Sequence, residues 1–138
     1  MKTLNPILLS GREVLPVVEG GKGISVSNGE SSGAWAGAGG VGTFSGVNAD
    51  YYDSDGKIMP QIYQGRTRQQ RHEELVAFAI KGGIAQARTA HEISGGQGRI
   101  HMNILWEMGA AERILQGILE GAKGLIHGVT CGAGMPYK

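Results

Sequence analysis

The sequence predicts an α/β fold in which parallel strands alternate with helices. Two observations carry this prediction: short apolar runs end in glycine-rich loops, and between them lie segments whose apolar residues recur at helical spacing. Glycine supplies 25 of the 138 residues, singly or in pairs between the apolar segments. This placement favours tight turns and close backbone approach to a ligand over disorder.

The first β/α unit organises the rest of the chain. Residues 14–18 predict a strand that ends in the glycine loop at residues 20–23, and residues 1–13 are expected to pack over one end of the sheet. The small residues 31–38 predict a helix, and residues 41–46 predict the second strand. A loop at the carboxyl end of a parallel strand is where such folds bind ligands, so the glycine loop is the first candidate site.

Residues 49–61 interrupt this alternation. Short β-prone flanks surround Asp55-Gly56, which is a sequence signal for a type I′ turn. We therefore expect a hairpin excursion on the ligand side of the sheet.

The next segment predicts a long helical region. Thr67 and Gln70 have the spacing of a capping box, so the helix is expected to begin at Thr67 and to end before residues 94–96. The pair Gly82-Gly83 predicts a kink, or a division into two helices. The expected apolar stripe is Leu75, Phe78, Ala79, Gly82 and Ala85.

Residues 100–105 predict the third strand. His101 and Asn103 point to one face of it, and two polar side chains near the carboxyl end of a buried strand indicate a ligand-lined face. Residues 125–130 predict the fourth strand. The helix between these strands carries the apolar stripe Ala111, Ile114, Leu115, Ile118, Leu119 and Ala122.

Composition argues against several classes of function. The net charge of +1 offers no bulk attraction for nucleic acid or an anionic membrane, and no apolar run reaches the roughly 20 residues of a membrane span. The apolar run at the start of the chain is too short for a signal peptide. The single cysteine, Cys131, suits a reducing cytoplasm. No metal-ligand spacing occurs. For His101 and His127 a hydrogen-bonded core position is favoured over a catalytic base, and His72 and His91 are expected at a helix surface.

Four segments stand in a distinctive order along the chain: LPVVEGGKG, AGAGGVGTFSG, RIHMNILWEMG and GLIHGVTCGAGMP. Together they resemble the nitronate monooxygenase family, formerly called 2-nitropropane dioxygenases, whose members are FMN-dependent (β/α)8 barrels. The resemblance implies that residues 1–138 form a partial FMN-binding domain, namely the first four β/α units of a TIM (β/α)8 barrel, truncated because a whole barrel needs about 250 residues. The family's catalytic histidine and its phosphate-binding loops are expected beyond residue 138.

The resemblance also implies which residues contact the flavin. They are the glycine loop after the first strand, an asparagine at the end of the third strand and the loop after the fourth: Gly20, Gly21, Lys22, Asn103, Thr130 and Cys131. The chain departs from the family pattern at two places. Glu19 stands where the family usually has glutamine, and Ala36-Gly37 replaces a Ser-Asn pair.

The function implied is that of a cytoplasmic flavoprotein oxidoreductase that uses FMN to oxidise alkyl nitronates with molecular oxygen. Two alternatives remain open: a flavin-dependent enoyl reductase of fatty-acid synthesis, and a non-catalytic half-barrel that binds a ligand without turnover. The unpaired strand edges of a half-barrel also predict association into a homo-oligomer.

Overall fold

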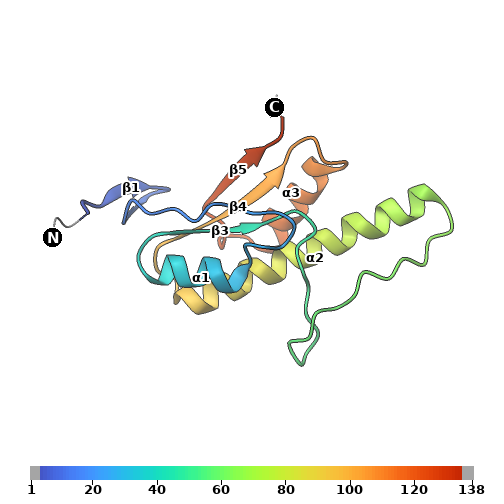
Figure 1. Ribbon diagram of the computed structural model, residues 1–138, viewed down its shortest axis with the longest axis horizontal. Coiled ribbons are helices and arrows are strands. Elements are labelled where there is room, and N and C mark those ends of the chain that lie inside the picture. Colours follow the sequence, from blue (N-terminus) through green and yellow to red (C-terminus); the bar gives the residue numbers. More distant parts are fainter. Residues whose placement is uncertain (1–3, 135–138) are drawn as a thin grey trace.

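The computed structural model describes residues 4–134, so Met135 and Pro136 of the last motif lie outside the described part. Strands and helices alternate after an amino-terminal hairpin (Figure 1). The elements are β1 (Ile7–Leu9), β2 (Arg12–Val14), α1 (Gly29–Gly37), β3 (Val41–Ser45), α2 (Arg68–Ser94), β4 (Arg99–Leu105), α3 (Ala111–Gly121) and β5 (Gly128–Gly132).

The main sheet has the strand order β3-β4-β5, and both pairs are parallel. The predictions for the second and third strands are confirmed, because β3 and β4 cover those residues. The α/β class is confirmed as well. The described sheet is open and does not close into a barrel.

The first predicted strand, residues 14–18, is wrong as a continuous strand. Val14 ends β2, which pairs antiparallel with β1, and only Val18 joins the main sheet, through a parallel bridge to Val41. Between them the Val17 N–H donates to the Leu15 carbonyl at 2.7 Å, which makes a γ-turn centred on the intervening proline. The proline ring fixes φ near the value that such a turn needs, so the chain bends where a strand was expected.

The fourth strand begins later than residues 125–130 predict. The Leu125 N–H still donates to the Ala122 carbonyl at 3.0 Å, and Gly124 has a φ of +81°. The chain is therefore still leaving α3 at this point, and β5 starts only at Gly128.

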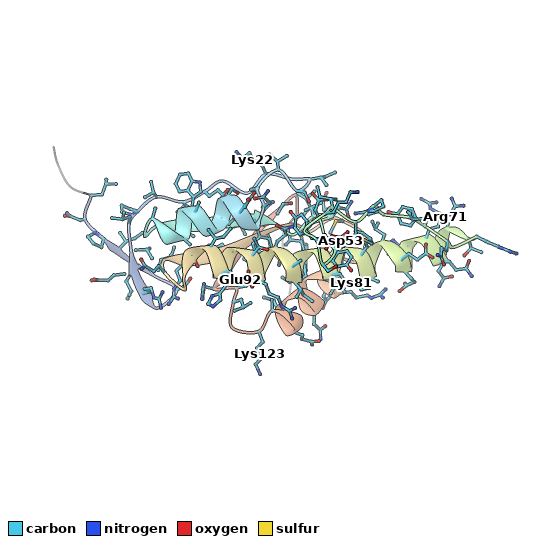
Figure 2. All side chains as sticks on the ribbon, turned by 90° about the horizontal axis from the view of Figure 1, so that it is seen from below. Lys22, Asp53, Arg71, Lys81, Glu92 and Lys123 are labelled. Carbon is cyan, nitrogen blue, oxygen red and sulfur yellow. The ribbon has the colours of Figure 1, made fainter. Side chains whose placement is uncertain are left out.

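All three helices pack on one face of the sheet, as Figures 1 and 2 show. Ile100, Met102 and Ile104 point toward them and are at most 1% exposed. His101 and Asn103 alternate to the opposite face. This opposite face, which we call the loop face, also carries Thr43, Ser45, Gly128 and Thr130, the residues in register with His101 and Asn103.

The start of α2 matches its prediction. The Thr67 hydroxyl accepts a hydrogen bond from the Gln70 N–H at 3.1 Å, and the Gln70 side-chain oxygen accepts one from the Thr67 N–H, which completes the capping box. The helix stripe is only partly right, since Ala79 and Gly82 are buried but the other predicted members are half-buried. Because α2 lies between α1 and α3, its buried surface is wider than one stripe: Val76, Ala79, Gly82, Gly83, Gln86, Ala87, Ala90 and Ser94.

The predicted kink or break at Gly82-Gly83 is wrong, because α2 runs unbroken through both residues. A Cβ atom on Gly82 would overlap the backbone carbonyl oxygen of Ala49, and one on Gly83 would lie 2.6 Å from Cγ1 of Ile118. These glycines allow close packing on two sides of α2. Among the described helices, none is long and apolar enough to cross a membrane.

The segment after β3 contains an isolated antiparallel bridge between Tyr52 and Ile58. The predicted type I′ turn is wrong, because that turn needs positive φ at two successive residues and only Gly56 has it, at +76°. The Asp53 side chain instead accepts a hydrogen bond from the Asp55 N–H at 2.9 Å. Such a bond favours a local turn of the ordinary hand.

The glycine contacts of α2 lead to a first prediction. Gly82→Ala should lower the free energy of unfolding by about 1–3 kcal/mol, because the new methyl group would overlap the Ala49 backbone. Gly37→Ala is the matched control: its methyl group would meet its nearest neighbour at 3.5 Å, an ordinary contact, and helix propensity gains up to about 1 kcal/mol. Urea unfolding followed by circular dichroism measures both, and equal losses would contradict the packing role of Gly82.

Candidate functional site

The glycine loop at residues 20–23 lies against the loop face. A Cβ atom on Gly21 would be 2.8 Å from Cγ of Asn103 and 3.2 Å from Cγ2 of Thr43, so the Gly21 backbone touches both side chains. Gly20 is exposed, and its Cβ position has no heavy atom within 4 Å. The structure therefore brings Gly21 and Asn103 together and leaves Gly20 beside open space.

The two predicted residues of β5 point in opposite directions. Thr130 is in register with Asn103, and neighbouring residues of parallel strands project from the same face, so Thr130 lies on the loop face and is exposed. Cys131 is in register with Ile104 and packs against the core beneath the helices. Thr130 thus joins the candidate site and Cys131 does not face it.

A buried carboxylate holds the start of the glycine loop. Glu19 is 7% exposed; it accepts a hydrogen bond from the Ser31 hydroxyl at 2.6 Å and another from the Thr43 N–H at 2.9 Å. Ser31 is in the first turn of α1, where a negative charge is favoured by the helix dipole. The sequence showed Glu19 only as a departure from a family pattern. A charged residue directly after an apolar run was the available signal for this anchoring role.

Hydrogen bonds between Lys22 and Ser27 close the glycine loop. The Lys22 N–H donates to the Ser27 hydroxyl at 2.7 Å, and the Ser27 N–H donates to the Lys22 carbonyl at 3.1 Å. Ser27 also accepts a bond from the Ser45 N–H at 2.8 Å, which fastens the loop to the end of β3. The Lys22 side chain itself is exposed at the surface (Figure 2).

Two polar side chains on the loop face lack protein partners. The Thr43 hydroxyl is buried and makes no hydrogen bond within residues 4–134. The amide of Asn103, which is half-buried, makes none to another residue of the same range either. Buried polar groups of this kind are usually bonded to protein, water or a ligand. Sequence reasoning found Asn103 but missed Thr43, because a threonine inside a strand is ordinary.

The histidines of β4 and of the turn before β5 lie toward the amino-terminal end of the sheet. Nδ1 of His127 accepts a hydrogen bond from the Ile100 N–H at 3.0 Å, and Nε2 of His101 is 3.4 Å from the Ser10 hydroxyl. Partial burial, and after it the positive charge of Arg99, lowers the pKa of both imidazoles. His127 is therefore a hydrogen-bonded structural histidine.

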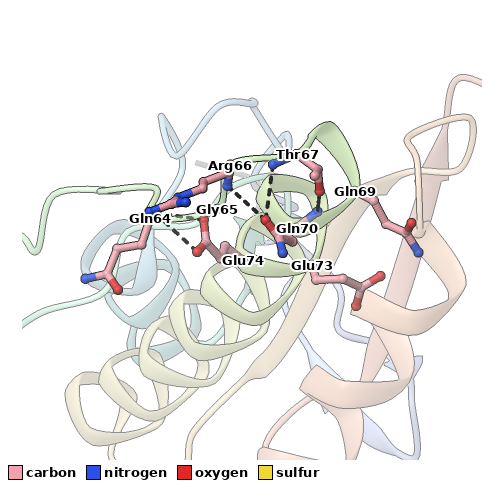
Figure 3. A pocket seen from close by; sticks show the side chains of 8 residues that line it. All are labelled: Gln64, Gly65, Arg66, Thr67, Gln69, Gln70, Glu73 and Glu74. Carbon is pink, nitrogen blue, oxygen red and sulfur yellow. Dashed lines mark hydrogen bonds between the residues drawn. The ribbon is translucent and has the colours of Figure 1, made fainter.

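Two surface grooves lie away from these residues. One, of about 710 Å³, forms where the chain folds back over the first turns of α2 (Figure 3). There the Gln64 N–H donates to both oxygens of Glu74, and the Arg66 N–H donates to Gln70. Another, of about 570 Å³, lies on α3 and is lined by Trp106, Glu112, Leu115, Gln116, Leu119, Glu120 and Lys123. Neither groove contains a predicted flavin contact.

No protein-family model matches the chain, and neither does any curated protein. The loop face must therefore be judged by its own chemistry. The exposed Gly20 backbone, the half-buried Asn103 amide and the exposed Thr130 hydroxyl are groups that can contact the flat face and polar edge of a planar heterocycle. Their chemistry is compatible with contact to the ring of FMN.

The glycine loop leads to a second prediction. Gly21→Ala should lower the free energy of unfolding by about 1–3 kcal/mol, because its methyl group would be forced into the Asn103 side chain. Gly20→Ala, the neighbouring control, should change it by less than about 0.5 kcal/mol, since the methyl group would enter open space. The measurement is urea unfolding of both variants. Equal effects would show that the loop does not rest on Asn103.

The histidines lead to a third prediction, on pH. Their pKa values are lower in the folded than in the unfolded chain, so the unfolded chain binds more protons once the pH falls below about 6.5. Stability present above that pH should be lost progressively below it. His127→Asn keeps an acceptor near the Nδ1 position but cannot titrate, so its urea midpoint should fall less between about pH 7.5 and pH 5.5.

The control for this pH series is His72→Asn, since His72 lies on α2 away from these elements and its side chain makes no hydrogen bond to another described residue. His72→Asn should keep the pH dependence of the unmodified chain. If it flattened the curve as much as His127→Asn, the dependence would not arise at the end of the sheet.

Proposed function

We propose that this chain supplies the ring-binding part of an FMN-dependent oxidoreductase of the nitronate monooxygenase type, which oxidises alkyl nitronates with molecular oxygen. The single observation that carries this proposal is the contact of Gly21 with Asn103 and Thr43 on the loop face. Gly21 and Asn103, which the resemblance implies as flavin contacts, come from distant parts of the sequence and meet there. Thr130 extends the same face.

Each of these residues has a role suited to a bound ring. The backbone at residues 20–21 is without side chains, so a flat ring can approach it closely. The Asn103 amide offers both a donor and an acceptor to the ring's polar edge, and the exposed Thr130 hydroxyl can serve either way. FMN, when bound, supplies the redox chemistry. Lys22 places a positive charge at the rim of the face, which suits an anionic substrate such as a nitronate.

The proposed catalytic histidine and the phosphate-binding loops lie outside this sequence, and FMN anchored without them should bind weakly. The single Cys131 supports a cytoplasmic location. Val129 of β5 is 37% exposed, so this unpaired edge supports association of the chain into a homo-oligomer.

Titration of FMN into the purified chain, followed by flavin fluorescence, tests the proposal. We expect saturable binding with a Kd in about the micromolar range or weaker. Asn103→Ala should lower the affinity for FMN by about 10-fold, because it removes an uncharged hydrogen-bonding group. Gly20→Ala should also weaken FMN binding while leaving the fold intact, because its methyl group would stand between the backbone and the ring. Gly37→Ala, on the helix side of the sheet, should bind as the unmodified chain does.

Turnover assays test whether the chain by itself has either of the two catalytic activities. Oxygen consumption with an alkyl nitronate tests the monooxygenase, and NAD(P)H oxidation with an enoyl thioester tests the enoyl reductase. The chain by itself is expected to be inactive in both. Sub-micromolar FMN binding by a monomer would contradict the weak anchoring, and FMN binding that ignores Asn103→Ala would overturn the assignment of the loop face.

A further inference from the structure

A second group of side chains gathers toward the amino-terminal end of the sheet, away from the glycine loop. It consists of Arg12, Arg99, His101 and His127, and we call it the basic cluster. Arg12 comes from β2, Arg99 and His101 come from β4, and His127 precedes β5. The proposed flavin chemistry uses none of these residues.

The turn between β1 and β2 brings the cluster together. The Arg99 Nε–H donates to the Leu9 carbonyl at 3.5 Å, and a Cβ on Gly11 would be 3.8 Å from Nη2 of Arg99. The Ser10 hydroxyl is 3.4 Å from Nε2 of His101. One hydroxyl, one guanidinium and one imidazole therefore converge around a single turn.

No carboxylate neutralises this charge within residues 4–134. The one ion pair in that range joins Arg113 to Glu73, between α3 and α2. Glu13 is adjacent to Arg12 on β2, and successive strand residues point to opposite faces, so its carboxylate is directed away. Like charges held together without a counter-charge repel one another, which is unfavourable unless water or an anion compensates.

The structural roles of the two arginines account for only part of their donors. Arg12 donates to the Gly96 and Gly98 carbonyls just after α2, where a positive charge is favoured by the helix dipole. Arg99 uses only Nε, through a long bond, and its two terminal NH2 groups make no hydrogen bond to another described residue. A guanidinium carries five N–H donors arranged as a fork that matches phosphate oxygens.

We propose that the Arg99 guanidinium, the Ser10 hydroxyl and the His101 imidazole bind a phosphate-type anion at the amino-terminal end of the sheet. Arg12 and His127 contribute nearby positive charge. The terminal NH2 groups of Arg99 donate to two oxygens, and the Ser10 hydroxyl donates to a third. The site is independent of FMN and would hold inorganic phosphate or the phosphate group of a small monoester.

The affinity of this site should depend on pH. The charged and titratable groups that face His101 and His127 from the surrounding elements are Arg99 on β4, Arg12 on β2 and His91 on α2, and all of them are basic. Protonation of the imidazoles adds positive charge, so phosphate of a given charge should bind more tightly to the protonated cluster than to the neutral one. Phosphate itself changes from a dianion to a monoanion over a similar pH range, so the observed affinity reflects both protonations. By linkage, bound phosphate raises the pKa of the imidazoles that it contacts.

Titration of inorganic phosphate into the chain, followed by the NMR signals of the histidine rings, tests the proposal. Sodium chloride is added to keep the ionic strength constant during the titration, because a change in ionic strength would alter the screening of surface charges. We expect the His101 and His127 signals to shift saturably at about pH 6, with a Kd on the order of 1 mM. Arg99→Gln should weaken binding by about 10-fold or more.

Arg88→Gln is the matched control, because it removes one exposed positive charge from α2 at a residue whose side chain makes no hydrogen bond to another described residue. It should bind phosphate as the unmodified chain does. If both variants lose affinity equally, net charge explains the effect and the site is overturned. Shifts that rise linearly without saturation also overturn it, whether or not Arg99→Gln folds.

If Arg99→Gln does not fold, the pKa of His101 in the unmodified chain still tests the site. A raised pKa of His101 in saturating phosphate supports the site, and an unchanged one overturns it. A parallel titration with methyl phosphate distinguishes the source of the anion, since tighter binding of the ester identifies a phosphomonoester ligand.

Discussion

The structure depends on the close approach of α2 to the helices on both sides of it. On one side, a Cβ atom on Gly33 of α1 would be 2.9 Å from the Ala90 carbonyl oxygen of α2. On the other, a Cβ on Gly117 of α3 would be 2.6 Å from Cδ1 of Ile80, so the isoleucine rests directly on the α3 backbone. Larger residues at either glycine would separate the helices and open the core.

A buried amide holds this packing in one register. Gln86 of α2 is 2% exposed; its Oε1 accepts a hydrogen bond from the Gly29 N–H at 2.6 Å, and its Nε2 donates to the Asp50 carbonyl at 2.6 Å. Any shift of α2 would leave these buried groups unsatisfied, at a cost of about 1–3 kcal/mol each. The amide thus joins the start of α1 to the segment after β3. The Ser25 hydroxyl in turn donates to the Asn48 carbonyl at 3.0 Å and ties that segment to the glycine loop.

This arrangement determines which side of the sheet is available for ligands. With the three described helices on one face, the other is contacted by loops and by the turn of the β1–β2 hairpin, so its exposed side chains can meet a ligand from the loop side. Asn103 was predictable because alternation along β4 separates it from its apolar neighbours. Thr43 and Glu19 were not, since their importance comes from what they contact across the chain. Cys131 was assigned to the site from the family resemblance, yet strand alternation turns it toward the core.

The sequence by itself determined the α/β class, the second and third strands, the parallel order and the start of α2, because each depends on local patterns of apolar residues and capping. Only the tertiary structure decided the rest. Gly82-Gly83 resembled a helix break in the sequence, but those glycines are where Ala49 and Ile118 reach the α2 backbone. The register of β5 and the unpaired charge of Arg99 likewise depend on contacts between distant segments. Such contacts cannot be predicted from periodic patterns, because the residues next to a position in the sequence do not show which distant residues pack against it.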